Sequence, residues 1–380
     1  MIIVDRTNHA AMTTNLLDHF STLNDPRIDR CKHHRLIDII AIAICATVCG
    51  AEGFTDFEDF GRAKHDWLRT FLELPNGIPS HDTFQRVFAR IDPEQFHTCF
   101  LSWIQAITTL STHRIVAIDG KTVRRSHNRS AGTQALHLIS AWAADNGLVL
   151  AQLKVDDHSN EITAIPEMLK MLVLDGAIVT IDAAGCQKNI ATEITNRGGE
   201  YLLALKQNHP TLFEDVSSIL QKARSEEMPG IVISQHECTD AGHGRVEVRR
   251  CFALELGWRW ADEWAKLRSI VLIESERHIG ETVSTEKRYY LTSLPPDANL
   301  LNEAVRSHWG IENSVHWVLD VVFREDDNRI RTDHAPQNMA ALRKIALNLL
   351  RKETTSKRGI KGKSKNAAWD NDYLLKVLTA

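Results

Sequence analysis

Ile115-Val-Ala-Ile-Asp119 and Ile178-Val-Thr-Ile-Asp182 are two short apolar runs that each end in an aspartate. Both are rich in β-branched residues, which is typical of buried strands. A carboxylate at the point where a buried strand leaves its sheet has a fixed backbone and open surroundings, which suits oxygen ligation of a hard divalent cation. Taken alone, each aspartate is more often an ordinary polar strand terminator than a metal ligand. The case for a metal site therefore depends on what lies between them.

The segment between the two runs predicts how they are connected. Two β-rich stretches, 137–145 and 148–155, flank the turn dipeptide Asn146-Gly147 and predict a hairpin. Ser159 or Asn160 then caps a helix through Met171, because apolar residues recur there at helical spacing. The chain returns with the second apolar run.

Strand, hairpin, crossover helix and strand is the order of the RNase H-like fold. In that fold the fourth strand lies parallel to the first and is reached by a right-handed crossover. We therefore expect an α/β protein with an RNase H-like catalytic core. Asp119 and Asp182 would leave adjacent strands side by side, although they are far apart in the sequence.

A third acidic residue, Glu312, lies in a segment with a helical pattern. Asp297 or Asn299 can cap this helix, and His308, Glu312 and His316 then share one face. Three hypotheses fit that face: a metal ligand that acts with the strand-end aspartates, a zinc site of the two histidines and the glutamate, and a solvated polar surface. Four acids that follow are alternative ligands in place of the glutamate: Asp320, Glu325, Asp326 and Asp327.

Longer motifs give the chain a family resemblance. They are Ala117-Ile-Asp-Gly-Lys-Thr122, Asp182-Ala-Ala-Gly-Cys-Gln187, Leu205-Lys-Gln-Asn208, His243-Gly-Arg-Val-Glu-Val-Arg249, Arg288-Tyr-Tyr-Leu-Thr-Ser293, His308-Trp-Gly-Ile-Glu-Asn-Ser-Val-His-Trp-Val-Leu-Asp320 and Phe323-Arg-Glu-Asp326. With these motifs the sequence resembles DDE transposases of bacterial insertion sequences, in the subgroup of the H-repeat-associated proteins. The resemblance covers nearly the whole chain.

The resemblance implies a catalytic triad of Asp119, Asp182 and Glu312, which also holds the metal. The cofactor expected from it is Mg²⁺ or Mn²⁺, with two ions in the site. Two such ions activate a water or a 3′-hydroxyl and stabilise the leaving oxygen. One site would then serve both the cut at the element's end and the joining to target DNA.

Many relatives carry a Tyr-Arg-Glu-Lys signature around the glutamate, and this sequence departs from it. Val305, His308 and Leu319 hold the positions of Tyr, Arg and Lys. We therefore expect Arg306 or His308 to supply the phosphate contact. The full set of expected DNA-binding residues is Lys121, Arg124, Arg125, Lys206, His243, Arg245, Arg306 and His308. For His243 and Arg245, an exposed charged hairpin is an equally good explanation.

Domain organisation follows from changes in pattern along the chain. Residues 1–110 predict a separate all-α domain, with Asp92-Pro-Glu-Gln95 as a typical helix start. The helix after Ser80 is either a recognition helix or a plain packing helix, and by resemblance this domain binds DNA ends. Residues 111–350 are expected to form the RNase H-like catalytic domain, with a β-rich insertion at about 207–295. Residues 351–380 are expected to be a basic C-terminal tail.

The charge of the whole chain argues against a dedicated nucleic-acid-binding protein. The formal net charge is −4 and the pI about 6.5, whereas such proteins are often strongly basic. Between residues 343 and 365, however, there are nine Lys or Arg and one acid. The Lys361-Gly-Lys-Ser-Lys365 part predicts either a flexible segment that follows phosphates or a merely solvated surface.

Cysteine usage and hydropathy indicate the compartment. The seven cysteines contain no CxxC pair, which indicates reduced thiols and a cytoplasmic protein. Cys186 is expected to pack in the core rather than to act as a nucleophile. The apolar run 36–48 is shorter than the roughly 20 residues that span a membrane, so no membrane partner is expected.

These observations predict a transposase that binds double-stranded DNA at the ends of its element and at the target. We expect a homodimer on DNA and association with the nucleoid in that state. Two alternatives remain: a catalytically silent DNA-binding protein derived from a transposase, and a nuclease without strand transfer.

Overall fold

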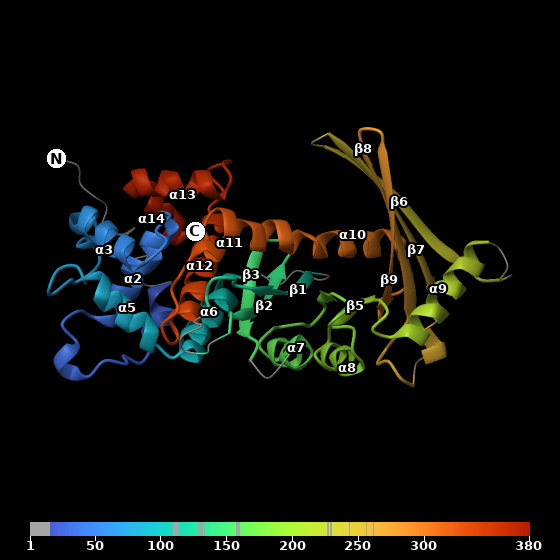
Figure 1. Ribbon diagram of the computed structural model, residues 1–380, viewed down its shortest axis with the longest axis horizontal. Coiled ribbons are helices and arrows are strands. Elements are labelled where there is room, and N and C mark those ends of the chain that lie inside the picture. Colours follow the sequence, from blue (N-terminus) through green and yellow to red (C-terminus); the bar gives the residue numbers. More distant parts are fainter. Residues whose placement is uncertain are drawn as a thin grey trace.

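The computed structural model describes residues 16–108, 114–127, 132, 134–156, 160–225, 228, 230–242, 244–255, 257–260 and 262–380. Figure 1 shows three regions in a row: a helical body that holds both described ends of the chain, a sheet with helices on both faces, and a long β-arm. Among the described residues, no helix combines the length and the apolar character needed to cross a membrane.

The helical body is built around α2, which is buried along almost its whole length. Asp92 caps α6 by accepting a hydrogen bond from the Glu94 amide, as the sequence predicts. Aromatic rings in contact fill the centre, among them Phe57, Phe84 and Phe88. The helices of this part are α2 (Leu36–Val48), α3 (Phe54–Ala63), α4 (His65–Leu68), α5 (His81–Arg90) and α6 (Pro93–Ile107).

The C-terminal helices complete this body. Helix α12 (Ala335–Lys352) contacts α2, α5, α6 and β3 (Leu148–Lys154). Its Asn338 donates to the carbonyls of Phe88 and Ile91 at 2.8 and 3.0 Å. One hydrophobic core runs from the helical body into the sheet. The helical body therefore shares its core with a helix distant in sequence, and the separate N-terminal domain stays a prediction.

The expected flexible basic tail is a packed pair of helices, α13 (Ile360–Trp369) and α14 (Asn371–Thr379). Lys363 is buried and donates to the carbonyls of Leu350, at 3.0 Å, and Glu353. The last carbonyls of a helix have no partner within the helix, so this lysine satisfies the end of α12. The segment expected to follow phosphates is folded against the protein instead.

The sheet has nine strands in the order β3-β2-β1-β4-β5-β9-β8-β7-β6. Strand β1 is parallel to β4 and β4 to β5, and the other pairs are antiparallel. The predicted order of strand, hairpin, crossover helix and strand is the one observed. The strands are β1 (Ile115–Thr122), β2 (His137–Ala143), β3, β4 (Ile178–Ile181), β5 (Glu200–Leu205), β6 (Ile233–Gly242), β7 (Arg245–Glu255), β8 (Ser269–Ile279) and β9 (Thr282–Thr292).

Helices cover both faces of the central strands. The crossover helix α7 (Glu161–Lys170), capped by Asn160, and α8 (Lys188–Asn196) lie on one face, and α10 (Ala298–His308) lies on the other (Figure 1). Helix α10 contacts β1, β4 and β5 of the centre and also β6 and β7 of the arm. It therefore holds the arm and the central strands together.

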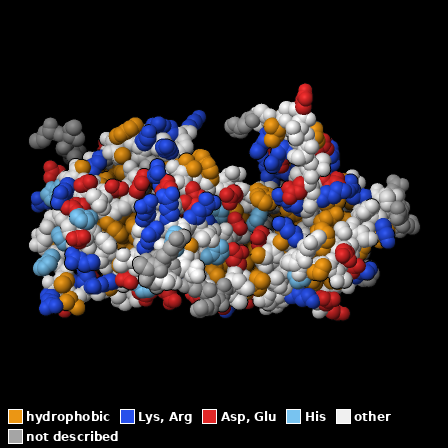
Figure 2. Space-filling model, viewed as in Figure 1, with side chains coloured by type: hydrophobic (Ala, Val, Ile, Leu, Met, Phe, Trp, Pro, Cys, Tyr) orange, Lys and Arg blue, Asp and Glu red, His pale blue; other side chains and the backbone are white. Residues whose placement is uncertain are grey.

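The β-rich insertion continues the central sheet instead of forming a separate unit. Strand β9 pairs with β5, and α9 (Pro210–Arg224) packs on β8 and β9. The outer ends of the arm's strands project past α10, and the space-filling view shows a hollow between the arm and the helical body (Figures 1 and 2). Helix α10, which packs on β1, β4 and β5, lies at the base of this hollow (Figure 1).

Candidate active site

Asp119 and Asp182 are brought together by strand pairing. Ile118 of β1 is in register with Ile181 of β4, so the next residue on each parallel strand is one of the two aspartates. The carboxyl ends of parallel strands meet at one edge of a sheet. The first four residues of β1 and all four of β4 are buried, whereas both aspartates are half-buried. The sequence-based expectation that they emerge side by side is confirmed.

A tight turn orients Asp182. Its carboxylate accepts hydrogen bonds from the backbone amides of Ala184 and Gly185 at 3.0 and 3.4 Å. A Cβ atom on Gly185 would lie 2.3 Å from Cγ2 of Ile181, so the turn requires glycine. The turn thus fixes the carboxylate at the mouth of the sheet.

Glu312 lines the same pocket as the two aspartates. It follows α10, which covers the face of the sheet opposite to α7 and α8. Helix α10 ends at His308, a π-helical turn follows from Glu312 to His316, and α11 (Trp317–Val321) continues the chain. Such turns carry one extra residue in a helix and are frequent at functional sites. Gly310 lets this segment approach the sheet, because a Cβ there would lie 2.6 Å from the Trp142 ring.

One pocket is lined by all three acids of the expected triad, Asp119, Asp182 and Glu312. Lys206 and Arg288 line the same pocket and supply positive charge. Other side chains that line it include Thr180, Tyr290, His308 and Trp309. The pocket therefore combines carboxylates that suit a divalent cation with bases that suit a phosphate.

His308 is held inside this pocket. Its Nδ1 lies 3.0 Å from Oγ1 of Thr180 on β4. Burial lowers the pKa of His308, although the carboxylates of Asp119 and Asp182 act in the opposite direction. The imidazole is therefore neutral at pH 7.

His316 is the histidine that contacts the acids. Its Nε2 lies 3.2 Å from Oδ2 of Asp119, and single ligand atoms of Asp119, Glu312 and His316 all lie within 4.8 Å of one another. The zinc hypothesis required His308 in this role. The structure brings Asp119 into the cluster in its place, while Asp182 lies in the same pocket outside that group of three.

Lys121, an expected DNA contact, is turned into the protein. It lies two residues after Asp119, is 13% exposed, and pairs with Asp320 and with Glu325, the latter at 3.0 Å. Glu325 is 1% exposed and also faces Arg343 at 3.7 Å. Desolvation would raise the pKa of Glu325, but Lys344, Lys121 and Arg343 together lower it, so this carboxylate is ionised.

The acids considered as substitutes for Glu312 are engaged elsewhere. Asp320 and Glu325 hold Lys121. Asp326 faces Arg124 at 3.3 Å, and Asp327 faces Arg125 at 3.5 Å. None of these four acids lines the pocket that holds Asp119 and Asp182.

The other expected DNA contacts are dispersed. Arg124 is 83% exposed beside β1. Arg245 is exposed at the start of β7 in the arm. Arg306 forms an ion pair with Asp240 of β6 and does not line the pocket. His243 lies outside the described residues.

Sequence reasoning missed one of the two cationic side chains that line the pocket with Glu312. Arg288 of β9 lies over the Trp309 ring, 4.2 Å from its centroid, and lines the pocket. The alternation Arg288-Tyr-Tyr290 was the available signal, because residues two apart on a strand share a face. The expected candidates, Arg306 and His308, came from the helix alone.

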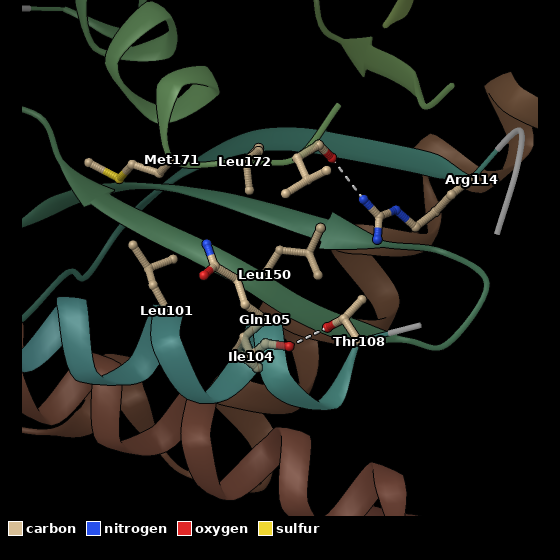
Figure 3. A pocket seen from close by; sticks show the side chains of 9 residues that line it. Leu101, Ile104, Gln105, Thr108, Arg114, Leu150, Met171 and Leu172 are labelled. Atoms are coloured by element: carbon tan, nitrogen blue, oxygen red, sulfur yellow. Dashed lines mark hydrogen bonds between the residues drawn. The ribbon is translucent and has the colours of Figure 1, made fainter. Parts of the chain in front are cut away.

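Cys186, four residues after Asp182, is buried in the core. Burial, together with the nearby Asp182, raises the pKa of Cys186 to about 12, in agreement with its expected packing role. A second cavity lies between α6, β3 and the end of α7 (Figure 3) and is lined mainly by apolar side chains such as Leu101 and Leu150. Arg114 lines it too, with Nη2 donating to the Val173 carbonyl at 3.0 Å. This cavity contains no carboxylate, so the candidate chemistry belongs to the first pocket.

Comparisons with known proteins identify the family of the chain. Residues 110–349 match the family model of the transposase DDE domain, and residues 17–104 match a model described as DDE_Tnp_1-associated. A solved piggyBac transposase synaptic complex with hairpin DNA aligns with 98% of this chain and 81% of its own, at 10% identity and a TM-score of 0.44. That likeness is too weak to place residues.

Three relatives match the chain over most of their own length. The "H repeat-associated putative transposase YhhI" of Escherichia coli K12 is 39% identical over 96% of this chain and 97% of its own length. "Putative protein YbfL" of the same strain is 38% identical over 96% of this chain and 97% of its own. An "uncharacterized protein in dhlA 3′region" of Xanthobacter autotrophicus is 44% identical over 76% and 97%. The chain belongs to the family of transposases with a DDE domain.

Proposed function

We propose that this protein is a metal-dependent DDE transposase that cuts DNA at the ends of its own element and joins the freed ends to target DNA. The observation that carries the proposal is the convergence of Asp119, Asp182 and Glu312 in one pocket at the ends of neighbouring parallel strands. The strand order β3-β2-β1-β4-β5 and the crossover helix α7 support an RNase H-like catalytic core.

The donor set of the pocket fits hard divalent cations, because carboxylate oxygens are the ligands that Mg²⁺ and Mn²⁺ prefer. Asp119, Asp182 and Glu312 would hold two such ions. When bound, the ions make an oxygen nucleophile reactive and stabilise the oxygen that leaves phosphorus. No covalent intermediate with the protein is required.

Basic side chains around the acids offer a path for a phosphodiester backbone. Lys206 and Arg288 line the pocket itself, and the exposed Arg124 lies beyond the end of β1. Arg245 extends the path into the arm. We propose that double-stranded DNA lies in the hollow between the arm and the helical body, and that the helical residues before 110 bind the terminal repeats. Synapsis of two ends requires a dimer on DNA.

The decisive experiment uses the full-length protein and DNA that carries both ends flanking its gene. Cleavage and joining are followed on a sequencing gel with Mg²⁺, Mn²⁺ or EDTA. The Asp182→Asn variant removes one carboxylate charge with little change in size. The matched control is Asp175→Asn, in the loop before β4 and away from the pocket.

The expected result is a 3′-hydroxyl cut at the ends followed by joining, abolished by EDTA and by Asp182→Asn but not by Asp175→Asn. Binding of the ends without cleavage under any metal would favour the silent DNA-binding alternative. Cleavage without joining would favour the nuclease. Cleavage that survives Asp182→Asn would exclude this pocket as the active site.

A further inference from the structure

We infer that His316 supplies a nitrogen ligand to the cation held by Asp119 and Glu312, and that this ion site prefers Mn²⁺ to Mg²⁺. The catalytic half of the inference rests on the proposed function, whereas the metal-binding half stands on this geometry alone. The three residues come from β1 and from the π-helical turn, and single ligand atoms of all three lie within 4.8 Å of one another.

His316 is buried beside a carboxylate, which is unusual for a histidine that binds nothing. Its side chain is only 5% exposed, and its Nε2 lies 3.2 Å from the Asp119 carboxylate. Burial of a polar ring costs free energy unless the ring has a partner. The adjacent Val315 and Leu319 are buried apolar residues, so this helix face would accept an apolar side chain if packing were the only requirement.

A separation of 3.2 Å fits two different relations between the atoms. It suits a hydrogen bond from Nε2 to Oδ2, and it also suits two neighbouring ligands of one ion at metal–ligand distances of about 2.1 Å. Which of these two relations His316 can adopt depends on the surroundings of its other ring nitrogen, Nδ1. In the part of the chain that the structure describes, the buried Nδ1 has no hydrogen-bond partner. Without an ion, the Asp119 carboxylate can accept a proton from Nε2. Because no described group donates to Nδ1, the ring proton can reside there instead, and Nε2 then presents its lone pair to an ion.

A nitrogen ligand changes which metal the site prefers. Mg²⁺ demands oxygen ligands in near-ideal octahedral geometry, whereas transition metals accept imidazole more readily. A set of two carboxylates and one imidazole therefore favours Mn²⁺ over Mg²⁺. His308 Nδ1 is engaged with Thr180, and the described residues hold no group of three such ligand atoms that includes Asp182. The preference is accordingly expected at one of the two ion positions.

The test is electron paramagnetic resonance of Mn²⁺ with the full-length protein in the absence of DNA. Loss of the free-ion signal gives the affinity, and competition with Mg²⁺ gives the selectivity. Pulsed measurements detect ¹⁴N coupled to the bound ion, and labelling the protein with ¹⁵N-histidine must change that coupling. The variants are His316→Gln, which keeps a hydrogen-bond donor near Asp119, and His308→Gln as the matched pocket control.

We expect a histidine nitrogen coupling in the wild type that is lost in His316→Gln and kept in His308→Gln. We also expect a loss of roughly tenfold or more in Mn²⁺ affinity for His316→Gln, with Mg²⁺ affinity nearly unchanged. Absence of nitrogen coupling in the wild type would overturn the inference, even if the variants did not fold. Coupling that persists in His316→Gln would overturn it as well.

The two proposals fail in different ways. Cleavage of DNA ends by a protein whose Mn²⁺ shows no nitrogen coupling would refute the role of His316 and leave the transposase proposal intact. Nitrogen coupling lost in His316→Gln, in a wild type that never cleaves, would support the metal site and refute the catalytic proposal.

Discussion

Gly310 shows how a single missing side chain sets the position of Glu312, the third carboxylate of the candidate site. A Cβ at this position would lie 2.6 Å from the buried ring of Trp142, which is held in β2 and cannot swing aside. We expect Gly310→Ala to push Glu312 away from Asp119 and to lower DNA cleavage at least tenfold, because displacements of about 1 Å cost that much or more.

The stability of Gly310→Ala should change far less than its activity. Overpacking costs about 1 to 3 kcal/mol, and the better helix propensity of alanine offsets about 1 kcal/mol of that. Thermal unfolding and cleavage are compared with those of Gly359→Ala, where an added Cβ meets no atom within 4 Å. Full activity of Gly310→Ala would show that the approach of helix and sheet is not critical.

Two lysines of the expected DNA-binding set separate stability from binding. Lys121 neutralises Glu325 inside the protein, so Lys121→Met should lower the free energy of unfolding by about 3 kcal/mol, as removal of one partner of a buried pair does. Lys206 is exposed at the pocket. Lys206→Met should keep the stability within about 0.5 kcal/mol and reduce the salt dependence of DNA binding by about one phosphate contact.

The measurements for this pair are chemical unfolding and DNA affinity at several salt concentrations. The double variant Lys121→Met with Glu325→Gln should regain part of the lost stability, because it removes the unpaired charge. Equal stability of the two single variants would contradict the buried role of Lys121.

At this scale the sequence predicts acids better than bases. Asp119 and Asp182 could be predicted because a strand end is a local pattern. The role of Lys121 could not, because its partners Asp320 and Glu325 lie about 200 positions away and only folding brings them to β1.

The contact between α6 and β3 contains a histidine that should make folding sensitive to acid. His97 Nε2 accepts a hydrogen bond from the Gln152 amide at 3.1 Å, which requires the neutral ring. Burial, with a smaller contribution from the charge of Lys344, lowers the pKa of His97 to about 4. Between pH 6.5 and 4 the unfolded chain therefore binds more protons, so stability is lost as the pH falls through this range.

The expected size of this effect is about 3 kcal/mol between pH 7 and pH 4. In His97→Gln the amide oxygen can still accept from Gln152, but nothing titrates there. Unfolding by urea at pH 7, 6 and 5 should thus show a flatter pH dependence for the variant. Parallel curves for the two proteins would mean that the pKa of His97 is the same in the folded and the unfolded chain.

Helices and strands could be predicted from the sequence where a short stretch of residues carries the whole pattern. The helix start at Asp92, the hairpin around Asn146-Gly147 and the crossover helix capped by Asn160 follow from short patterns, and the structure contains all three. The π-helical turn from Glu312 to His316 did not follow, because a single irregular turn inside a helical segment is too short to give a periodic pattern of its own. The packed state of α13 was hidden for another reason: its buried Lys363 is identical in type to its exposed neighbours Lys361 and Lys365.

On the scale of the whole molecule, the helical body and the sheet should unfold as one unit. Their hydrophobic core is continuous, and α12 lies between them. Asn338 of α12 donates to the carbonyls of Phe88 and Ile91, so Asn338→Ala leaves two buried acceptors without partners. The expected loss of stability is about 1 to 3 kcal/mol.

Calorimetry distinguishes one cooperative unit from two. For the wild type we expect a single transition that contains the helical body and the sheet, and for Asn338→Ala the same single transition at a temperature lower by a few degrees. Asn299→Ala, at an exposed position at the start of α10, is the control and should leave the transition in place. Two transitions, of which Asn338→Ala moves only one, would restore the separate N-terminal domain that the sequence pattern predicts and the shared core argues against.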